Sequence, residues 1–319
     1  MRTVILGTGS YLPEKIVTSE EMEDRLGLDR GYIFEKTRIR ERRVAAPSEV
    51  TSDLAAHAAR QALDAAGIEP GAVDALLVAT STPDQPMPAT ACRVQAAIGA
   101  TRACAFDLQA VCSGFIYALK VAHSMLVADP AYSTALVIGA DIYSHILDYT
   151  DPRTSILFGD GAGAVVLGKV PGGQGLLAST LSSDGRHADL IQVPVGGFFT
   201  MNGREVRRLA TEKMAGVVTD LCTAVGVTLP DVDLIVPHQA NGVMLADLAE
   251  TLRLAPDMMH LTVGKYGNTG AASVPITLDD AVRAGRLQQD SLLLLVAFGG
   301  GATWGGVALR WMTTRSTPI

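Results

Sequence analysis

Two apolar patterns alternate along the chain and predict helices and buried strands. Small-residue stretches with apolar positions at helical spacing predict helices over residues 54–66, 112–128, 211–225 and 272–284. Short, continuously apolar runs follow them, and further strands are predicted over residues 4–7, 162–167 and 305–311. Glycines at positions 67 and 226 stand where two of the helices need a left-handed cap. Such alternation favours parallel strands with helices on the sheet faces.

The pattern is also repeated at a fixed offset. The segment GIEPGAVDALLV at 67–78 matches GVTLPDVDLIV at 226–236, an offset of 226 − 67 = 159 residues. The same offset carries ALVIG at 135–139 onto LLVAF at 294–298. Two matches at one offset indicate a duplication. We therefore predict an α/β fold of two stacked halves, residues 1–170 and 171–319, related by a pseudo-twofold axis and separated in turn-rich sequence near residue 170.

Composition narrows the class of protein. The 319 residues are 48% hydrophobic and 18% charged, which suits a large buried core that needs no disulfide. A net charge of −7, with one short basic cluster at 38–43, argues against a nucleic-acid partner. The four cysteines lack metal-ligand spacing and suit free thiols in a reducing compartment, so we expect no metal site. Without a signal-like start or an apolar run of about 18 residues, we expect a soluble cytoplasmic protein with no membrane contact.

Three polar side chains follow predicted strands. Cys112 begins a small-residue helix, whose N-terminus can stabilise a thiolate; the alternative is a buried cysteine that serves as a small hydrophobe. His238 follows the run at 234–236 and, taken alone, suits a structural histidine. Asn268 lies in a glycine-flanked turn, where a turn or capping role is the alternative. Position 271 is the repeat mate of 112, so the axis would bring all three into one crevice, an arrangement suited to acyl transfer through a thioester.

Two glycine-rich segments carry less specific signals. The triplet at 299–301 either presents a backbone N–H to an oxyanion or makes a sharp turn between strands. The segment FGDGAG at 158–163 lacks the spacing of a dinucleotide-binding loop and runs into a predicted strand, which excludes a Rossmann-type cofactor site there.

At these residues the sequence resembles the β-ketoacyl-acyl-carrier-protein synthase III family of the thiolase superfamily. The blocks that carry the resemblance span nearly the whole chain: GTGSYLP at 7–13, the Cys112 segment, FGDGAGA at 158–164, VPHQAN at 236–241, GNT at 267–269, AASVP at 271–275 and FGGGATWG at 298–305. The resemblance implies a thiolase-like fold in five α-β-α-β-α layers, a homodimer, and Claisen condensation without a cofactor.

The resemblance also implies roles for residues. Cys112 would take an acyl group from an acyl-CoA, with the backbone N–H groups of Cys112 and Gly300 as the oxyanion hole. His238 and Asn268 would polarise the thioester carbonyl of malonyl-acyl-carrier protein and stabilise the enolate left by CO2 loss. A neutral His238 that donates through Nε2 suits this role. The residues implied in substrate binding are Tyr32, Lys36, Met87, Arg207 and Asn241, with Met87 at an acyl-pocket position that the partner subunit can supply.

Several positions depart from the family pattern. Arg38 stands where the family has glycine, Val243 stands where it usually has an arginine used on carrier protein, and Arg207 replaces an aromatic residue near the tunnel. The chemistry is therefore expected to be kept while donor and acceptor recognition change, as in a specialised pathway. The alternative keeps the acyl-Cys112 intermediate and passes the acyl group to a hydroxyl or amine without CO2 loss.

Other classes are less well supported. A degradative thiolase needs a second cysteine near the C-terminus, whereas the last cysteine here is Cys222. A cysteine hydrolase of papain type does not suit the duplication. A non-catalytic scaffold would need a Cys112 that is inert to acyl-CoA.

Overall fold

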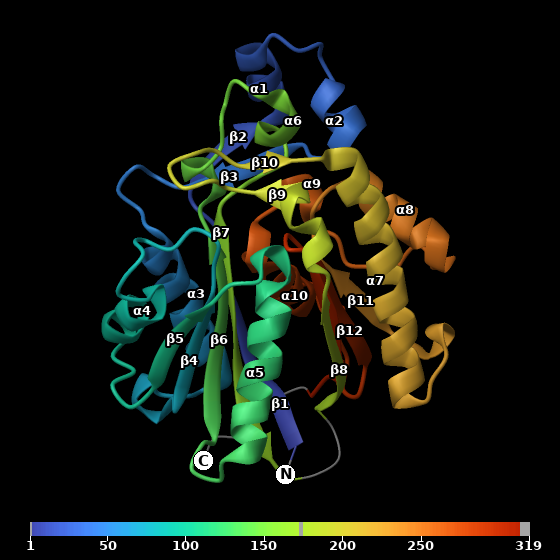
Figure 1. Ribbon diagram of the computed structural model, residues 1–319. Coiled ribbons are helices and arrows are strands. Elements are labelled where there is room, and N and C mark those ends of the chain that lie inside the picture. Colours follow the sequence, from blue (N-terminus) through green and yellow to red (C-terminus); the bar gives the residue numbers. More distant parts are fainter. Residues whose placement is uncertain (1, 172–174, 313–319) are drawn as a thin grey trace.

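Two β-sheets with helices between and outside them make up the computed structural model, which describes residues 2–171 and 175–312 (Figure 1). The first sheet has the strand order β1 (Arg2–Tyr11), β7 (Gly161–Val170), β6 (Thr134–Asp141), β4 (Ala75–Ala79) and β5 (Cys104–Leu108). The second has the order β11 (Leu234–Pro237), β12 (Leu292–Gly299), β13 (Thr303–Arg310) and β8 (Leu176–Ser183).

Strand pairing is mixed, which corrects the expectation of parallel sheets. Strand β4 pairs in parallel with β5 and β6, and β11 pairs in parallel with β12. The remaining pairs of the two sheets, β1 with β7, β6 with β7, β12 with β13 and β13 with β8, are antiparallel. The reason is plain at β12 and β13, because the turn of three residues between them is too short for a crossover.

Helices form the other three layers. The outer face of the first sheet is covered by α3 (Thr51–Ala66) and α4 (Thr90–Ile98), and that of the second by α7 (Gly203–Val225) and α8 (Gly242–Leu252). Between the sheets lie α5 (Gly114–Ala128) and α10 (Ser273–Arg283), whose apolar residues share one core with strands of both sheets (Figure 1). The five-layer thiolase-type arrangement expected from the sequence is confirmed.

The predicted helices are present, with one boundary well displaced. Helix α7 begins at Gly203 instead of residue 211, because Asn202 Oδ1 accepts the backbone N–H of Glu205 and caps an earlier first turn. As predicted, Gly67 caps α3 with φ of 64° and Gly226 caps α7 with φ of 73°.

Short elements that the pattern did not predict gather at one end of the molecule, above the sheets in Figure 1. They are β2 (Lys15–Thr18), α1 (Ser19–Leu26), α2 (Tyr32–Thr37), β3 (Glu41–Val44), α6 (Pro152–Ser155), β9 (Ile191–Gln192), β10 (Thr200–Met201) and α9 (Val263–Tyr266). Elements of this length give too few turns or alternations to show a period. They stand over the end of the molecule where the parallel strands terminate.

The two sheets divide the chain close to residue 170. Strand β7 of the first sheet ends at Val170 and β8 of the second begins at Leu176, while residues 172–174 of the expected turn lie outside the part described. Strands β4, β6 and β7 have β11, β12 and β13 as counterparts, and an isolated parallel bridge between Ile235 and Met259 stands where β5 pairs with β4. We propose that the halves 1–170 and 171–319 meet at this connection.

One segment corrects the statement that no apolar run approaches membrane length. In the described ranges, Val111–Ala128 is long and apolar enough to cross a membrane by composition alone. Its position between the two sheets is that of a core helix, because Phe115, Ile116 and Leu119 are fully buried there. Its apolar character is explained by burial on two sides.

Close approach of α3 to β1 gives a test of the packing. A Cβ at Gly9 would lie 2.6 Å from the carbonyl oxygen of Ala58 and 2.7 Å from Cβ of Gln61, both on α3. We expect Gly9→Ala to lower the free energy of unfolding by about 1–3 kcal/mol, since the helix must move outward. Gly71→Ala, where a Cβ meets nothing within 4 Å, is the control and should change it by less than about 0.5 kcal/mol. Denaturant unfolding of both variants measures this, and equal stabilities would contradict the packing.

Candidate active site

Cys112 sits in a tight turn between the first sheet and the central helix. The 3-10 turn Val111–Ser113 follows β5 and leads directly into α5, and Cys112 is buried there. Val111 has φ of 49°, an unfavourable left-handed conformation for a β-branched residue. Gly299 of β12 packs against this turn so closely that a Cβ on it would lie 2.8 Å from the Cys112 nitrogen. Both halves of the chain therefore hold the turn in place.

Burial changes the expected ionisation of the Cys112 thiol. It raises the pKa to about 12, and the negative charge of Asp141 acts in the same direction. The helix N-terminus was expected to stabilise a thiolate, but loss of solvent raises the pKa of this thiol instead. The resting group is a thiol, so its proton must leave when the sulfur attacks.

His238 follows β11 and is held as a neutral donor. Its Nδ1 lies 2.6 Å from Ser273 Oγ, and that oxygen already accepts the backbone N–H of Gln239 at 3.1 Å. Among the described residues Nδ1 is the one acceptor within reach of the Ser273 hydroxyl, so we assign the hydroxyl proton to this bond and the ring proton to Nε2. Burial also lowers the pKa of His238 to about 3. The imidazole is neutral at physiological pH and presents an N–H on the side away from Ser273.

Asn268 is fixed through both its backbone and its side chain. Its backbone N–H donates to the Leu157 carbonyl at 2.8 Å, and its carbonyl accepts the Gly159 N–H at 3.0 Å. Its Oδ1 accepts the Gly270 N–H at 2.9 Å. Because that donor has to face the oxygen, the amide orientation is set and Nδ2 is left as a donor.

The turn at the start of α10 links the three residues. Ser273, the partner of His238, is the first residue of α10, and the 3-10 turn Gly270–Ala272 connects it to Asn268. The same turn packs on the nucleophile segment, since a Cβ at Gly114 would lie 3.8 Å from Cβ of Ala271. Cys112 and the turn that leads to Ser273 thus lie at the N-termini of the two central helices, where the helix field favours developing negative charge. The shared catalytic role of Cys112, His238 and Asn268 stays a prediction.

A cavity of about 370 Å³ opens beside the nucleophile turn. Ala110, Val111, Tyr143, Phe199 and Gly300 contribute to its wall, and the Tyr143 hydroxyl lies 4.0 Å from Cys112 Sγ. The Tyr143 ring stacks on the Phe158 ring, with 4.3 Å between the ring centroids, which fixes its position. Gly300 stands in the turn from β12 to β13 and in the cavity wall, and its N–H as an oxyanion donor stays a prediction.

The residues expected to bind substrate do not line this cavity. Tyr32 and Lys36 are exposed on α2, where the Lys36 ammonium pairs with Glu35 at 3.0 Å and lies over the Tyr32 ring. Asn241 caps α8: its Oδ1 accepts two backbone N–H groups and its Nδ2 donates to the Lys36 carbonyl at 3.2 Å. Met87 is 79% exposed. Their roles toward substrate remain predictions.

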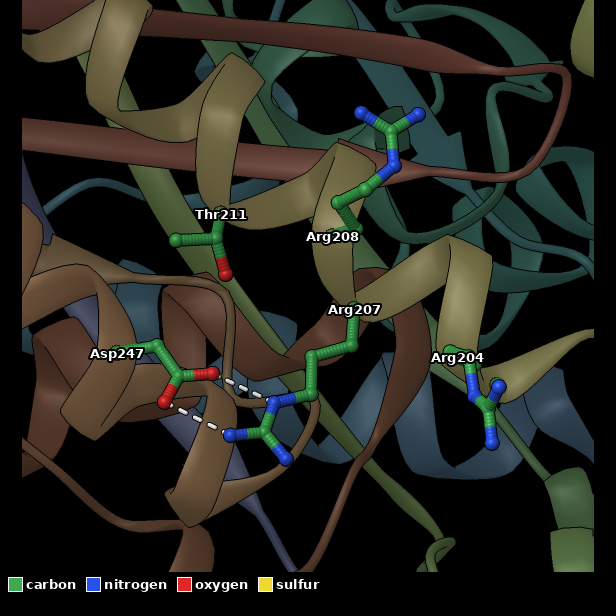
Figure 2. A pocket seen from close by; sticks show the side chains of 6 residues that line it. Arg204, Arg207, Arg208, Thr211 and Asp247 are labelled. Carbon is green, nitrogen blue, oxygen red and sulfur yellow. Dashed lines mark hydrogen bonds and ion pairs between the residues drawn. The ribbon is translucent and has the colours of Figure 1, made fainter.

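Arg207 lies in an outer groove between α7 and α8. Its guanidinium forms a bidentate ion pair with Asp247, with Nε–Oδ2 at 2.5 Å and Nη2–Oδ1 at 2.8 Å, and Arg204 and Arg208 line the same groove (Figure 2). Arg208 pairs with Glu205 at 2.5 Å and with Glu212 at 3.3 Å, so carboxylates offset two of the three guanidinium charges. The arginine that replaces the family's aromatic residue therefore points at a carboxylate on α8.

Three residues around the site were missed by sequence reasoning. Ser273 contacts His238, and Tyr143 contacts Cys112. The third residue, the buried Asp141, accepts hydrogen bonds from both halves of the chain. A carboxylate at the end of a continuously buried strand, as at Asp141, is a signal that could have been used. Over residues 2–171 and 175–312, no group of three or more His, Cys, Asp or Glu side chains is placed to hold a metal ion.

Comparison with known proteins gives consistent matches. Family models for 3-oxoacyl-(acyl-carrier-protein) synthase III match residues 106–185, and for its C-terminal part residues 222–311. The chain is 46% identical to a β-ketoacyl-(acyl-carrier-protein) synthase III of Acidiphilium cryptum, over 97% of this chain and 99% of that one. It is 47% identical to an acetoacetyl CoA synthase of Streptomyces sp., over 98% and 99%. A crystal structure of the synthase III from Aquifex aeolicus superposes with a TM-score of 0.94 at 39% identity, covering 97% of this chain and 100% of that one.

Proposed function

Since the chain belongs to the β-ketoacyl-acyl-carrier-protein synthase III family of condensing enzymes, we propose that it joins an acyl group held on Cys112 to a malonyl thioester with loss of CO2. The observation that carries this proposal is the pair of oriented donors, Nε2 of His238 and Nδ2 of Asn268, on the segments that adjoin the nucleophile turn. Acyl-CoA is the proposed donor and malonyl-acyl-carrier protein the proposed extender.

In the first step the Cys112 sulfur attacks the acyl-CoA carbonyl. The carbonyl oxygen becomes an oxyanion that the N–H groups of Cys112 and Gly300 can receive. Collapse expels CoA, which takes up the proton that the thiol gives up, and leaves a thioester on Cys112. Because burial raises the pKa of the thiol, the proton is on the sulfur at the start and has to leave it as the sulfur attacks.

In the second step His238 and Asn268 donate to the carbonyl oxygen of the malonyl thioester. The bond to the carboxylate breaks, CO2 leaves, and the electron pair forms an enolate whose oxygen both donors stabilise. The enolate carbon attacks the acyl-Cys112 carbonyl, and the Cys112 sulfur leaves as a thiolate that regains a proton. Because His238 is neutral, it stabilises the enolate without giving up a full proton.

This division of labour favours condensation over the non-decarboxylating alternative. Transfer of the acyl group to a hydroxyl or amine needs a base that removes the acceptor's proton. His238 presents an N–H instead of a lone pair, since its Nδ1 is engaged by Ser273. Two donors outside the proposed oxyanion hole suit a second negative oxygen, the enolate left by CO2 loss, which acyl transfer does not form.

A second extender is a candidate because of one position. Val243, in the first turn of α8, stands where the family usually has an arginine used on carrier protein. The 47% identical Streptomyces relative carries the name acetoacetyl CoA synthase. We therefore propose malonyl-CoA as the alternative extender, with the same chemistry at Cys112, His238 and Asn268.

The test follows the acyl group and the CO2 separately. We expect intact-protein mass spectrometry to show one acyl group on the enzyme after incubation with a short-chain acyl-CoA. Addition of malonyl-acyl-carrier protein or of malonyl-CoA, each labelled in the free carboxylate, should discharge it with release of labelled CO2. The faster extender identifies the acceptor. An acyl-enzyme that neither extender discharges, but a hydroxyl or amine does, would overturn condensation in favour of acyl transfer.

We also propose that the enzyme is a cytoplasmic homodimer. The exposed Met87, on a segment that follows β4, is the residue that the family pattern places at a partner's acyl pocket. The free thiols of the four cysteines suit a reducing compartment such as the cytoplasm.

A further inference from the structure

Asp141 is a fully buried carboxylate that the mechanism above does not use. It ends β6, in the half that carries Cys112, and its exposed fraction is 0%. A buried carboxylate is stable only where its oxygens are well supplied with donors. Burial nevertheless raises its pKa to about 6, so it is ionised at neutral pH and above. The donors around it show which parts of the fold it joins.

Its two oxygens face different parts of the chain. Oδ1 accepts the Ser81 N–H at 2.7 Å and the hydroxyls of Thr80 and Thr82 at 3.2 Å each, all after β4 in the first half. Oδ2 accepts the Ala271 N–H at 2.7 Å, in the second half. One carboxylate therefore ties the end of the first sheet to the turn at the start of α10.

That turn carries the amide donor of the site. Gly270 begins this turn with φ of 59°, and a Cβ there would overlap Asp141 Oδ2 and the Tyr143 ring. The Gly270 N–H is the donor that orients the Asn268 side chain, through Oδ1 at 2.9 Å. A shift of the turn away from β6 would therefore turn the Asn268 amide away from its working direction.

We propose that Asp141 is a positioning residue for the decarboxylation step: it holds the Gly270–Ala271 turn, and through it the Asn268 amide, in the orientation that receives the malonyl thioester oxygen. The proposal rests on the decarboxylating function proposed above. Asp141 makes no hydrogen bond to Cys112, so its loss should slow decarboxylation of the malonyl thioester and leave acylation of Cys112 intact.

The substitution Asp141→Asn separates the two oxygens. The Asn carbonyl oxygen is expected at the Oδ1 position, where three donors meet, which places its NH2 against the Ala271 N–H and breaks only the link to the turn. The substitution also removes the negative charge that raises the pKa of Cys112. We expect acylation from acyl-CoA at the wild-type rate or faster, and CO2 release per acylated enzyme slower by about 10- to 100-fold.

Asp74→Asn is the matched control. Asp74 is another buried carboxylate of the first half, which accepts the N–H groups of Ser133 and Thr134 at the opposite end of β4. Both half-reactions of this variant should stay at the wild-type rate. If Asp141→Asn yields little folded protein, Thr80→Val removes one donor to Oδ1 and should show the same split at a smaller size.

The outcomes test the positioning role of Asp141 separately from the proposed decarboxylative condensation. Rates are normalised to the acylated fraction measured by intact mass, so partial unfolding does not mimic the effect. Equal loss of acylation and CO2 release in Asp141→Asn, or no loss in either, would overturn the positioning role. Wild-type enzyme that forms the acyl-enzyme and releases no CO2 from either malonyl thioester would instead overturn the proposed condensation and leave the geometry of Asp141 unaffected.

Discussion

Cys112→Ala is expected to abolish acyl-enzyme formation, the largest effect of any single substitution in this protein. The sulfur is the atom that would carry the acyl group, and the methyl of alanine offers no nucleophile in its place. Condensation should fall by about 10⁴-fold or more, as for the loss of other covalent nucleophiles. Intact-protein mass after incubation with acyl-CoA measures the first effect, and the yield of β-ketoacyl product from a malonyl thioester measures the second.

Cys92→Ala provides the matched control for this loss. Cys92 is a free, half-buried cysteine on α4, whose Sγ lies 3.8 Å from the Ala105 carbonyl, on the outer face of the first sheet. That variant should gain one acyl group as the wild type does. An acyl mass that persists in Cys112→Ala, or disappears in Cys92→Ala, would show that the nucleophile has been assigned to the wrong cysteine.

The sequence predicted the frame of the fold because the frame is made of long periodic elements. The apolar runs that became β6 and β12 and the helices α3, α5 and α10 have enough turns or alternations to show their period. The offset of 159 residues then related the Cys112 segment to the turn after Asn268, and the structure does place that turn against the start of α5. A repeat therefore conveys information on tertiary proximity that periodicity alone lacks.

What the sequence could not show are the effects of burial and the antiparallel strands. The N-terminus of α5 was expected to favour a thiolate at Cys112, yet desolvation raises the pKa of that thiol to about 12. The direction of this pKa shift depends on how much solvent the surrounding Tyr143 and Gly299 exclude, which no local sequence pattern encodes. The mixed sheets were missed because the direction of a strand depends on the length of the connection to its neighbour. The short turn before Thr303, which makes β12 and β13 antiparallel, can be recognised only when the ends of both strands are known.

Substrate recognition was the least predictable part. Tyr32, Lys36, Asn241 and Arg207 were assigned by position in a family pattern, and in this chain the polar atoms of the last three are engaged with Glu35, the α8 backbone and Asp247. Surface side chains take partners that differ from one member of a family to the next, whereas the residues around Cys112 are fixed by packing from both halves. The segments around Cys112 could therefore be placed from the sequence more closely than the substrate contacts, and the roles of the site residues stay predictions.

His238→Ala and Asn268→Ala are expected to leave acylation intact and to lower CO2 release, each by about 10²- to 10³-fold. Each substitution removes one donor to the enolate oxygen, and both side chains are buried, which strengthens such a hydrogen bond. Neither side chain is hydrogen-bonded to Cys112, and His238, with its pKa lowered to about 3, carries no charge that would alter the thiol. The acyl-enzyme should therefore accumulate in both variants when malonyl thioester is supplied.

His260→Ala separates loss of a donor from loss of any buried histidine. His260 follows Met259, which bridges to β11, but its Nε2 pairs with Asp280 of α10 at 2.6 Å, so both half-reactions should proceed. The double variant His238→Ala, Asn268→Ala decides whether the two donors act on one oxygen. If they do, its loss should be smaller than the product of the single losses, because the second donor has less to stabilise once the first is gone. Fully multiplicative losses would mean that His238 and Asn268 act at different atoms or in different steps.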